Sequence, residues 1–243
     1  MTISFVLVES ALQRVPDSIR AHPQIKRYVT KRGKDIENVL LDRAYHHSSM
    51  KSLARMGYPL SIEKMGRPDI IHNALLQVLE TPLSWEGHLQ VLIHTQDDYV
   101  ITVNSKIRLP KNYVRFVGLI EQLFDQQRVP LEDEPLLAIK RMTLPQLIKN
   151  ANPDRVIGFS TLGQPELLRV VAERICKFNH PMVFIGAFPR GHFRDETQQL
   201  VDEIYRIDRE GLDSWIVAGR FVYDCESCLG ITNNRLKNVR CPK

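Results

Sequence analysis

The order of hydrophobic and polar positions predicts a chain that begins with a buried strand and ends in alternating strands and helices. Residues 3–8 form a continuous apolar run that stops at Glu9, which is typical of a strand covered on both faces. In the C-terminal part, strands are predicted at 156–159, 182–185 and 215–217, and helices at 165–175, 200–205 and 221–229. This alternation predicts an α/β fold with a mostly parallel sheet and helices on both faces.

The rest of the chain contains further predicted helices and one hairpin. Helices are predicted at 10–20, where Pro16 interrupts the pattern, and at 45–56, 68–79 and 112–124. An apolar run within 34–42 predicts a strand that ends at Asp42, and residues 89–94 and 99–103 predict a β-hairpin. The acidic, proline-marked segment 130–145 predicts a surface loop or linker.

Positive charge is gathered in two clusters that contain no acidic residue. The chain has 243 residues, 25% of them charged, and a formal net charge of +5. The first cluster consists of Arg20, Lys26, Arg27, Lys31, Arg32 and Lys34, and the second of Lys106, Arg108, Lys111 and Arg115. Either cluster alone is typical of a solvated face. Two clusters that flank the segment Gly66–Ile70 favour an RNA-binding surface.

Several classes of protein are disfavoured by what the sequence lacks. No apolar run approaches the length of a membrane span, and the N-terminus lacks the features of a signal peptide, so an intracellular, cytoplasmic protein is expected. A P-loop, a G-x-G-x-x-G motif, a nucleophile elbow and a zinc-protease motif are missing. Cys225 and Cys228 have zinc-knuckle spacing, but a second pair is missing and Cys241 stands alone. Helical cysteines, buried or bridged to another part of the chain, are therefore expected instead of a metal site.

Three predicted strand ends are candidates for a ligand site, because parallel α/β sheets bind ligands beyond the carboxyl ends of their strands. These candidates are 159–163, 186–193 and 212–217. The middle one has Gly186 and Gly191 around an Ala-Phe-Pro-Arg core, and glycine allows backbone amides to approach a ligand closely. Such strand endings are common, so each is weak evidence on its own.

The segment Gly66–Ile70 is a second candidate, since Pro68 places Arg67 and Asp69 at the start of a helix. The guanidinium of Arg67 is suited to bind a phosphate or a base edge. Asp69 has two interpretations that stay open. It accepts a proton in catalysis, or it has a structural role in which it holds Arg67 or caps the helix. The structural role is favoured at least as strongly.

The segment 104–116 mixes cations with two aromatic residues. Cations follow the phosphates of RNA, and aromatic rings stack on its bases. In the alternative arrangement, Tyr113 and Phe116 face the core and only the cations are exposed. The two arrangements are compatible, with Phe116 inside.

Three blocks of sequence follow one another along the chain. The first is Leu40-Leu41-Asp42 with His46-His47 and Met50, and the second is Gly66-Arg67-Pro68-Asp69-Ile70-Ile71-His72. The third contains Asn104, Arg108-Leu109-Pro110-Lys111, Arg115-Phe116 and Gly118-Leu119. Together they resemble the ribosome-biogenesis pseudouridine methyltransferase family, which belongs to the SPOUT class of methyltransferases. The resemblance covers nearly the whole chain, and its second block is quite specific.

The resemblance implies a fold and an activity. The fold would be a single SPOUT domain, residues 1–243, with a C-terminal trefoil knot and a family-specific β-rich insertion, working as a homodimer. The insertion would lie at roughly 45–110 and the donor-binding knot at roughly 155–235. The activity would be transfer of a methyl group from S-adenosyl-methionine to N1 of a pseudouridine in small-subunit ribosomal RNA. A role in small-subunit biogenesis follows, with ribosomal proteins of that subunit as further partners.

The resemblance also assigns residues to two sites. The RNA-binding cleft would contain Arg67, Asp69, Arg108, Lys111 and Arg115. The donor would be contacted by Phe159, Ser160, Gly186, Gly191, His192, Phe193, Leu212, Asp213, Ser214, Trp215, Ile216 and Val217. The sequence departs from the family pattern in two places. Lys111 stands where relatives often have arginine, which weakens a bidentate phosphate contact, and the last donor segment lacks the expected Tyr-Pro-Leu-Ser character.

Methylation of N1 requires alignment of donor and target and removal of the N1 proton. Asp69 is the candidate base that the motif offers. Two other functions remain open: an rRNA-binding assembly factor whose methyl transfer is incidental or lost, and a SPOUT methyltransferase that acts on tRNA. The basic clusters fit every one of these functions, so donor binding and the choice of RNA must discriminate between them.

Overall fold

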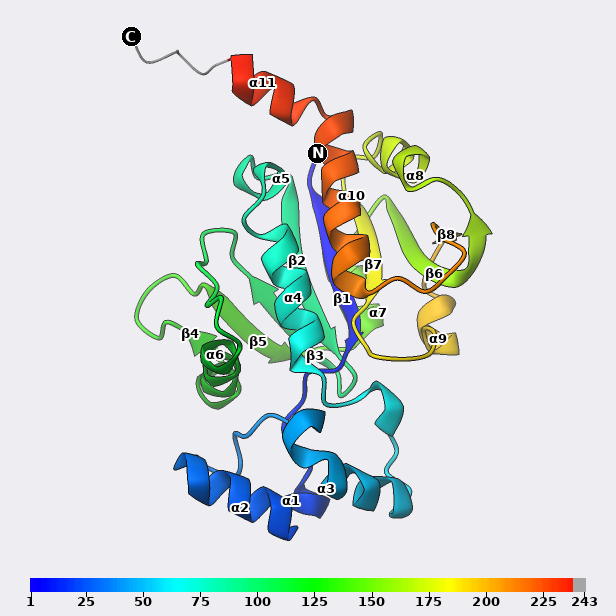
Figure 1. The fold of residues 1–243 in the computed structure, drawn as a ribbon. Coiled ribbons are helices and arrows are strands. Elements are labelled where there is room, and N and C mark those ends of the chain that lie inside the picture. The colour runs from blue at the N-terminus through cyan, green and yellow to red at the C-terminus, as the bar shows by residue number, and fades with distance from the viewer. Residues whose placement is uncertain (238–243) are drawn as a thin grey trace.

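In the computed structural model, which describes residues 1–237, the chain forms an eight-stranded sheet covered by helices (Figure 1). The strands are β1 (Ile3–Ser10), β2 (Leu89–Thr95), β3 (Tyr99–Val103), β4 (Arg128–Val129), β5 (Leu137–Arg141), β6 (Arg155–Pro165), β7 (Pro181–Gly186) and β8 (Glu203–Arg206). Their order in the sheet is β4-β5-β3-β2-β1-β7-β6-β8. Strands β2, β1, β7, β6 and β8 pair in parallel, and β2, β3, β5 and β4 pair antiparallel. The predicted α/β fold with a mostly parallel sheet is confirmed.

Strand β1 lies in the middle of the sheet because its side chains are almost all apolar. Phe5 and Leu7 are fully buried, and so are Val6 and Val8 on the other face. Phe5 pairs with Val91 of β2 and with Val183 of β7, both in parallel. The carboxyl ends of these three strands therefore lie at the same edge of the sheet, where α/β proteins bind ligands.

Helices cover both faces of the sheet (Figure 1), with α4, α6 and α10 in front and α7 behind in this view. The helices around the sheet are α4 (Pro68–Val78), α5 (Pro82–Trp85), α6 (Tyr113–Gln126), α7 (Leu144–Ala151), α8 (Leu168–Ile175), α9 (Asp195–Gln198), α10 (Ser214–Cys228) and α11 (Ile231–Lys237). Helix α10 packs between α4 and α8. Among the described residues, no helix is long and apolar enough to cross a membrane.

A small helical unit lies beyond the carboxyl end of β1 (Figure 1). It consists of α1 (Asp17–Arg20), α2 (Pro23–Arg32), α3 (Arg43–Arg55) and the 3-10 helix η1 (Ile62–Lys64). The unit has a hydrophobic core of its own, which includes Ile25, Leu41, Leu53 and Met65. Most of the first basic cluster is carried by α2, so these charges lie at the edge of the sheet where ligands are expected.

Two predictions for the C-terminal part are wrong. Residues 200–205, predicted as a helix, overlap β8 from Glu203 onward, where Tyr205 is buried and pairs with Phe159 of β6. Residues 215–217, predicted as a strand, form the first turn of α10. Val217 is buried there and Ile216 is 40% exposed. An apolar run of three residues does not distinguish a strand from a helix.

Three further segments differ from the prediction. The strand expected within 34–42 reduces to an isolated bridge between Arg14 and Leu40, and the helix expected at 10–20 reduces to α1. The segment 130–145, expected to be a loop, contains β5, which pairs with β3. Strands β2 and β3 form the predicted hairpin and join the main sheet. Helices α3, α4 and α6 confirm the predictions at 45–56, 68–79 and 112–124.

Candidate functional site

A cavity of about 410 Å³ lies where the ends of β6 and β7 meet the start of α10. Its lining includes eleven of the twelve residues predicted to contact the donor: Phe159, Ser160, Gly186, Gly191, His192, Phe193, Leu212, Asp213, Ser214, Trp215 and Val217. The twelfth, Ile216, lies outside this lining. The candidate segments 159–163, 186–193 and 212–217 thus come together at one edge of the sheet. The volume is within the range of small-molecule sites.

The end of β7 is packed so closely that Gly186 has no room for a side chain. A Cβ at this position would lie 2.8 Å from the Phe188 ring and 3.3 Å from the Phe193 ring. The Ser214 hydroxyl donates a hydrogen bond to the Gly186 carbonyl, which ties the first turn of α10 to β7. Gly191 has a φ of +88°, a conformation that favours glycine. These contacts give the loop 187–194 a defined path along the cavity wall.

Arg67 and Ile70 also line the cavity, so the two sites expected from the sequence are neighbours. Arg67 Nε lies 2.8 Å from Asp69 Oδ1, and Arg67 Nη2 lies 2.7 Å from Asp69 Oδ2. Two parallel hydrogen bonds of this kind fix the plane of the guanidinium. The hydrogen bond to Asp69 also raises the pKa of Arg67. Both oxygens of Asp69 are engaged by Arg67, which is the geometry of an orienting residue.

The backbone on either side of Arg67 is held by hydrogen bonds. The Arg67 N–H donates to the Ala11 carbonyl at 3.1 Å, and the Arg43 N–H donates to the Gly66 carbonyl at 2.8 Å. Gly66 has a φ of +67°, and a Cβ there would lie 3.2 Å from the sulfur of Met50. The segment Gly66–Ile70 is therefore fixed between α3 and the chain that leaves β1.

His72 connects α4 to the cationic segment 104–116. Its Nε2 lies 2.7 Å from the carbonyl oxygen of Pro110, and its ring stacks on Phe116 with the centroids 4.4 Å apart. Because a carbonyl oxygen can only accept, Nε2 carries the proton and donates it. Phe116 is fully buried, so this contact joins the segment to the core.

The cations of this segment point outward and its aromatic residues point inward. Exposed positions are occupied by Arg108, Lys111 and Arg115. Lys111 forms a 3.4 Å ion pair with Glu80, whereas neither arginine has an ion pair with any other residue in 1–237. The Tyr113 hydroxyl donates to Asp42 Oδ2 at 2.6 Å, and burial together with this hydrogen bond raises the pKa of Tyr113. The exposed surface of this segment is therefore cationic.

The first basic cluster is partly neutralised within the chain. Arg20 forms a 2.8 Å ion pair with Asp17, and Lys34 forms an ion pair with Glu121. The members that remain exposed are Lys26, Arg27, Lys31 and Arg32. Within the described residues, the unpaired positive charge of this cluster is thus confined to α2.

Cys225 and Cys228 both lie in α10, where Cys225 is buried and Cys228 is exposed. Together with Cys176 they are free thiols. A hydrogen bond with Cys176, reinforced by burial, raises the pKa of Cys225. Within residues 1–237, no group of three or more His, Cys, Asp or Glu residues is placed to hold a metal ion. Cys241 lies outside the described residues.

Comparison with known proteins decides the family. The model of the EMG1/NEP1 methyltransferase family matches residues 5–226. The chain belongs to this family. The ribosomal RNA small subunit methyltransferase Nep1 of Pyrococcus furiosus is 36% identical over 224 residues, which cover 92% of this chain and 96% of that protein. The Nep1 of Staphylothermus marinus is 37% identical over 233 residues, covering 94% and 97%.

A solved structure of an EMG1/NEP1 protein matches the fold as well. The crystal structure of Archaeoglobus fulgidus Nep1 bound to S-adenosylhomocysteine has a TM-score of 0.81 and 34% sequence identity. The match covers 95% of this chain and 100% of that chain. The resemblance read from the three sequence blocks is therefore confirmed.

In this EMG1/NEP1 chain the cavity also contains residues that were not predicted from the sequence as site residues. Arg190 of the loop 187–194 lines it, as do Arg206, Asp208 and Glu210 at and after β8. The last three were missed because β8 was predicted as a helix. Burial lowers the pKa of Arg43, and repulsion by Arg67 and Arg190 lowers it further. Three arginines therefore gather where the cavity meets the segment Gly66–Ile70.

Proposed function

We propose that this EMG1/NEP1 methyltransferase transfers the methyl group of S-adenosyl-methionine to N1 of a pseudouridine in small-subunit ribosomal RNA. The observation that carries the proposal is that the cavity between β6, the end of β7 and the start of α10 is also lined by Arg67, which Asp69 orients. A site for a small donor and a site for a polyanion thus lie side by side. A relative of solved structure binds S-adenosylhomocysteine, and the curated relatives are named small-subunit rRNA methyltransferases.

The lining of the cavity is chemically suited to S-adenosyl-methionine. Phe159 and Trp215 offer apolar surface for an adenine ring, and Ser160 offers a hydroxyl for a polar group of the donor. Asp213 supplies negative charge for a ligand that carries a sulfonium and an ammonium group. Gly191 allows the backbone to approach the ligand. When bound, the donor supplies an electrophilic methyl group.

We assign the RNA backbone to the cations beside this cavity, namely Arg67, Arg108, Lys111 and Arg115. Arginine binds phosphate with two hydrogen bonds, whereas Lys111 acts as a point charge. The contact between His72 and Pro110 holds the cationic segment against α4, the helix that begins beside Arg67. An RNA strand whose phosphates bind these cations would therefore reach the mouth of the cavity at Arg67.

The chain contributes mainly by positioning the two reactants. The N1 proton of pseudouridine must leave as the bond between N1 and the methyl carbon forms, so a base or a water is needed. Asp69 is the candidate base, but both its oxygens bind Arg67. We therefore assign Asp69 first to orienting Arg67, and a base role would require one oxygen to leave the guanidinium.

The first experiment measures transfer of a tritiated methyl group to RNA. The substrates are a small-subunit rRNA fragment that contains pseudouridine, the same fragment with uridine, and tRNA transcripts. We expect label on the pseudouridine fragment alone, because N1 of uridine is bonded to the ribose and cannot accept a methyl group. Equal labelling of the uridine fragment would exclude N1 as the target, and preferential labelling of tRNA would favour a tRNA methyltransferase.

Donor binding separates an enzyme from an assembly factor that has lost catalysis. We expect S-adenosylhomocysteine to give a heat of binding in calorimetry and to raise the unfolding temperature, because a ligand that binds the folded state stabilises it. No heat and no thermal shift would favour the assembly factor.

The variant Asp69→Asn tests the role of the carboxylate. Asn keeps the shape of the side chain but removes the charge that orients Arg67, and the pair is about one-third exposed, so we expect RNA affinity to fall about two- to fivefold. Single-turnover methyl transfer at saturating RNA should remain close to that of the wild type. A loss of about a hundredfold or more under those conditions would instead assign the base to Asp69.

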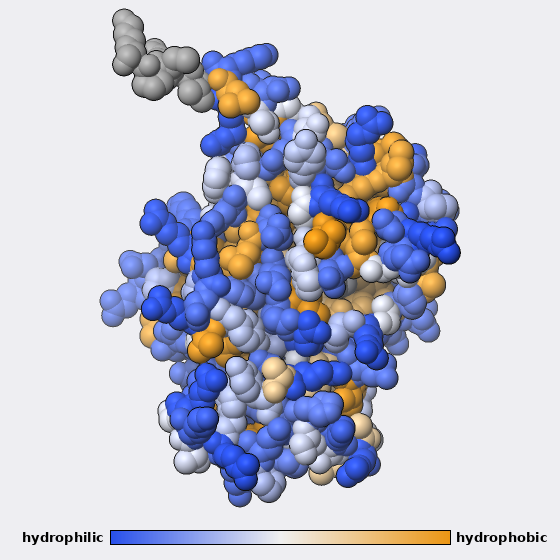
Figure 2. Space-filling view, in the orientation of Figure 1, coloured by the Kyte–Doolittle hydropathy of each residue, from blue (hydrophilic) through white to orange (hydrophobic). Residues whose placement is uncertain are grey.

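We also propose that the protein is a homodimer with a trefoil knot within 155–235, as the family resemblance implies. Large apolar side chains on β6, just before α8 and on α10 support an interface, since Leu162, Leu167 and Tyr223 are 62%, 66% and 70% exposed. Figure 2 shows hydrophobic residues gathered on the side of the molecule that carries α8, at the upper right of the view. Such patches mark association sites. Sedimentation should give twice the chain mass, and a monomer at high concentration would contradict the dimer.

Ribosomal proteins of the small subunit and a cytoplasmic location remain part of this proposal, because both follow from a ribosomal substrate. Co-sedimentation of the chain with small-subunit particles, compared with naked rRNA of the same sequence, tests the first. Equal affinity for both would remove ribosomal proteins as partners.

A further inference from the structure

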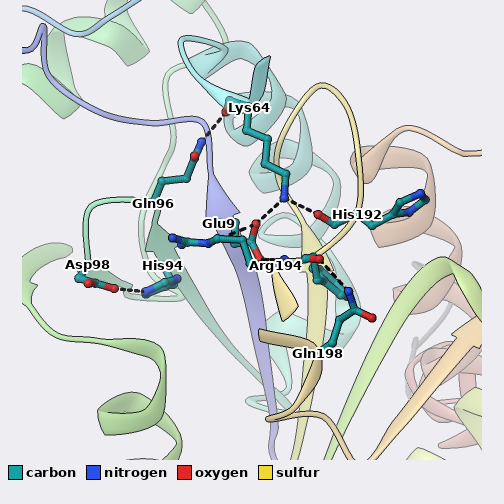
Figure 3. Close-up of polar contacts among 9 residues, drawn as sticks. Glu9, Lys64, His94, Gln96, Asp98, His192, Arg194 and Gln198 are labelled. Carbon is teal, nitrogen blue, oxygen red and sulfur yellow. Dashed lines mark hydrogen bonds and ion pairs between the residues drawn. The ribbon is translucent and has the colours of Figure 1, made fainter. Parts of the chain in front are cut away.

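A buried ion pair lies beside the loop 187–194 and contacts it (Figure 3). The side chain of Glu9 is fully buried, and its φ of +50° is uncommon for a residue other than glycine. Its Oε2 accepts a hydrogen bond from Lys64 Nζ at 2.7 Å, and its Oε1 accepts one from the Arg194 N–H at 2.7 Å. A carboxylate without access to water needs partners of this kind. The Arg194 guanidinium is a second, longer ion-pair partner, with its Nε 3.7 Å from Glu9 Oε2. Glu9 therefore binds both Lys64 and the end of the loop.

Lys64 contacts the loop at three points. Its ammonium donates a hydrogen bond to the His192 carbonyl and lies 4.1 Å from the centroid of the Phe188 ring. A cation over an aromatic face is attracted by the ring. A Cβ at Gly191 would lie 3.5 Å from Lys64 Cε, so the lysine stem also packs against the loop backbone. Figure 3 shows Lys64 reaching from its own segment to the His192 carbonyl.

The same region of the chain leads to the RNA side of the cleft, because Lys64 shortly precedes Arg67 in the sequence. A second connection runs through the backbone. The Ala11 N–H donates to the Ala187 carbonyl at 2.8 Å, and the Arg67 N–H donates to the Ala11 carbonyl at 3.1 Å. The loop 187–194 is thus joined to Arg67 both by a side chain and by main-chain hydrogen bonds.

We propose that Lys64, held in place by Glu9, is a positioning residue that fixes the loop 187–194 for binding of the methyl donor. The proposal rests on the donor site proposed above. Neither Lys64 nor Glu9 belongs to the lining of the cavity, whereas Phe188 and His192 do, so the ion pair acts through the loop. A loop that is not fixed beforehand must be ordered when the ligand binds, and that ordering lowers the affinity.

The variant Lys64→Met tests the proposal, since it keeps the apolar stem and removes the ammonium. We expect the Kd for S-adenosylhomocysteine, measured by calorimetry well below the unfolding temperature, to rise about tenfold, which corresponds to about 1.4 kcal/mol. The KM for S-adenosyl-methionine should rise by a similar factor while kcat at saturating donor changes little. A role confined to stability would leave both the Kd and the KM unchanged.

Glu121→Gln is a matched control for Glu9→Gln. Glu121 is also buried, and it also accepts from a lysine, Lys34, and from a backbone N–H, that of Leu40 at 3.2 Å. It lies in α6 and lines no part of the cavity. We expect both variants to lower the unfolding temperature and only Glu9→Gln to weaken binding of S-adenosylhomocysteine. Equal weakening by both variants would overturn the proposal.

The double variant Glu9→Gln/Lys64→Met separates stability from positioning. Neutral replacement of a buried ion pair is often tolerated. Glu9→Gln alone leaves the Lys64 ammonium without its carboxylate, and Lys64→Met alone leaves Glu9 with Arg194, whose Nε lies 3.7 Å away, as its cationic partner. We expect the unfolding temperature to recover relative to the single variants and the Kd for S-adenosylhomocysteine to stay raised. Wild-type affinity in the double variant would refute the positioning role. If the wild type itself fails to bind S-adenosylhomocysteine, the donor site is wrong and the positioning proposal falls with it.

Discussion

Gly163→Ala should destabilise the fold and disturb the donor cavity at the same time. Gly163 lies in β6 where this strand crosses the backbone of β8. A Cβ at this position would lie 2.6 Å from the carbonyl carbon and oxygen of Ile204 and 2.6 Å from the carbonyl carbon of Tyr205. All three are backbone atoms, so a change of side-chain rotamer cannot relieve the contact. Tyr205 also lines the cavity, which connects this contact to the ligand site.

The size of the effect follows from the overlap. Carbon atoms normally approach to roughly 3.5–4.0 Å, so β6 and β8 must separate by about 1 Å to accept the methyl group. Overpacking of this kind typically costs about 1–3 kcal/mol. At roughly 2–4 °C per kcal/mol for a chain of this size, the unfolding temperature should fall by roughly 2–12 °C. Binding of S-adenosylhomocysteine should weaken because β8 carries part of the cavity wall.

Gly118→Ala is the matched control for this substitution. Gly118 lies within α6, and a Cβ there meets nothing within 4 Å. Alanine is a better helix former than glycine by about 0.5–1 kcal/mol, so this variant should unfold at a slightly higher temperature and bind S-adenosylhomocysteine normally. Thermal unfolding and calorimetry on the two variants give the comparison. A Gly163→Ala protein as stable as the wild type would show that β8 does not cross β6 at Gly163.

Two further predictions concern pH and salt. Burial lowers the pKa of His46 to about 4, and its Nδ1 accepts the Asp42 N–H at 3.0 Å. Because the imidazole takes up a proton on unfolding, its contribution is complete above the unfolded pKa of 6.5 and is lost as the pH falls toward 4. Between pH 7 and pH 5 the free energy of unfolding should fall by at most about 2 kcal/mol through this group. His46→Gln should unfold with a smaller pH dependence over this range, and an equal dependence would contradict the assignment. Arg108→Ala should weaken rRNA binding and flatten the plot of log Kd against log salt by roughly 0.7–0.9, whereas an unchanged slope would remove Arg108 from the RNA surface.

The parts of the fold that could be predicted are those in which local and tertiary preferences agree. Helix α4 begins at Pro68, where proline is favoured, and buries apolar residues at helical spacing. Strand β1 is buried on both faces and is therefore a plain apolar run. Strand β8 was mistaken for a helix because Leu200, Val201, Ile204 and Tyr205 have helical spacing. Pairing with β6 decides the conformation of β8, and the local sequence of β8 does not indicate that pairing.

The candidate site was predictable to the extent that it consists of strand ends and of the segment Gly66–Ile70. Glycines and a proline mark these places in the sequence. Lys64 and Glu9 could not be found in the same way, because a charged residue normally indicates a surface position. Glu9 was interpreted as the polar end of a strand, and its partner lies in a separate helical unit. Burial of both side chains follows from their pairing, which a hydrophobic pattern does not describe.

The end of β1 sets the relation between the two ligand sites. The Ala187 N–H donates to the Val8 carbonyl at 3.0 Å, the Ala11 N–H donates to the Ala187 carbonyl, and the Ala11 carbonyl accepts from Arg67. Residues 8–11 therefore hold the start of the loop 187–194 on one side and Arg67 on the other. Methyl transfer is sensitive to misplacement of the reacting groups by as little as about 1 Å. Since both proposed sites are bonded to the same main chain, we expect a shift of that chain to move the donor and RNA contacts together. Asp69 then needs to fix only the orientation of Arg67, and Lys64 only that of the loop 187–194. We therefore expect substitution of either residue to weaken binding before it slows the chemical step.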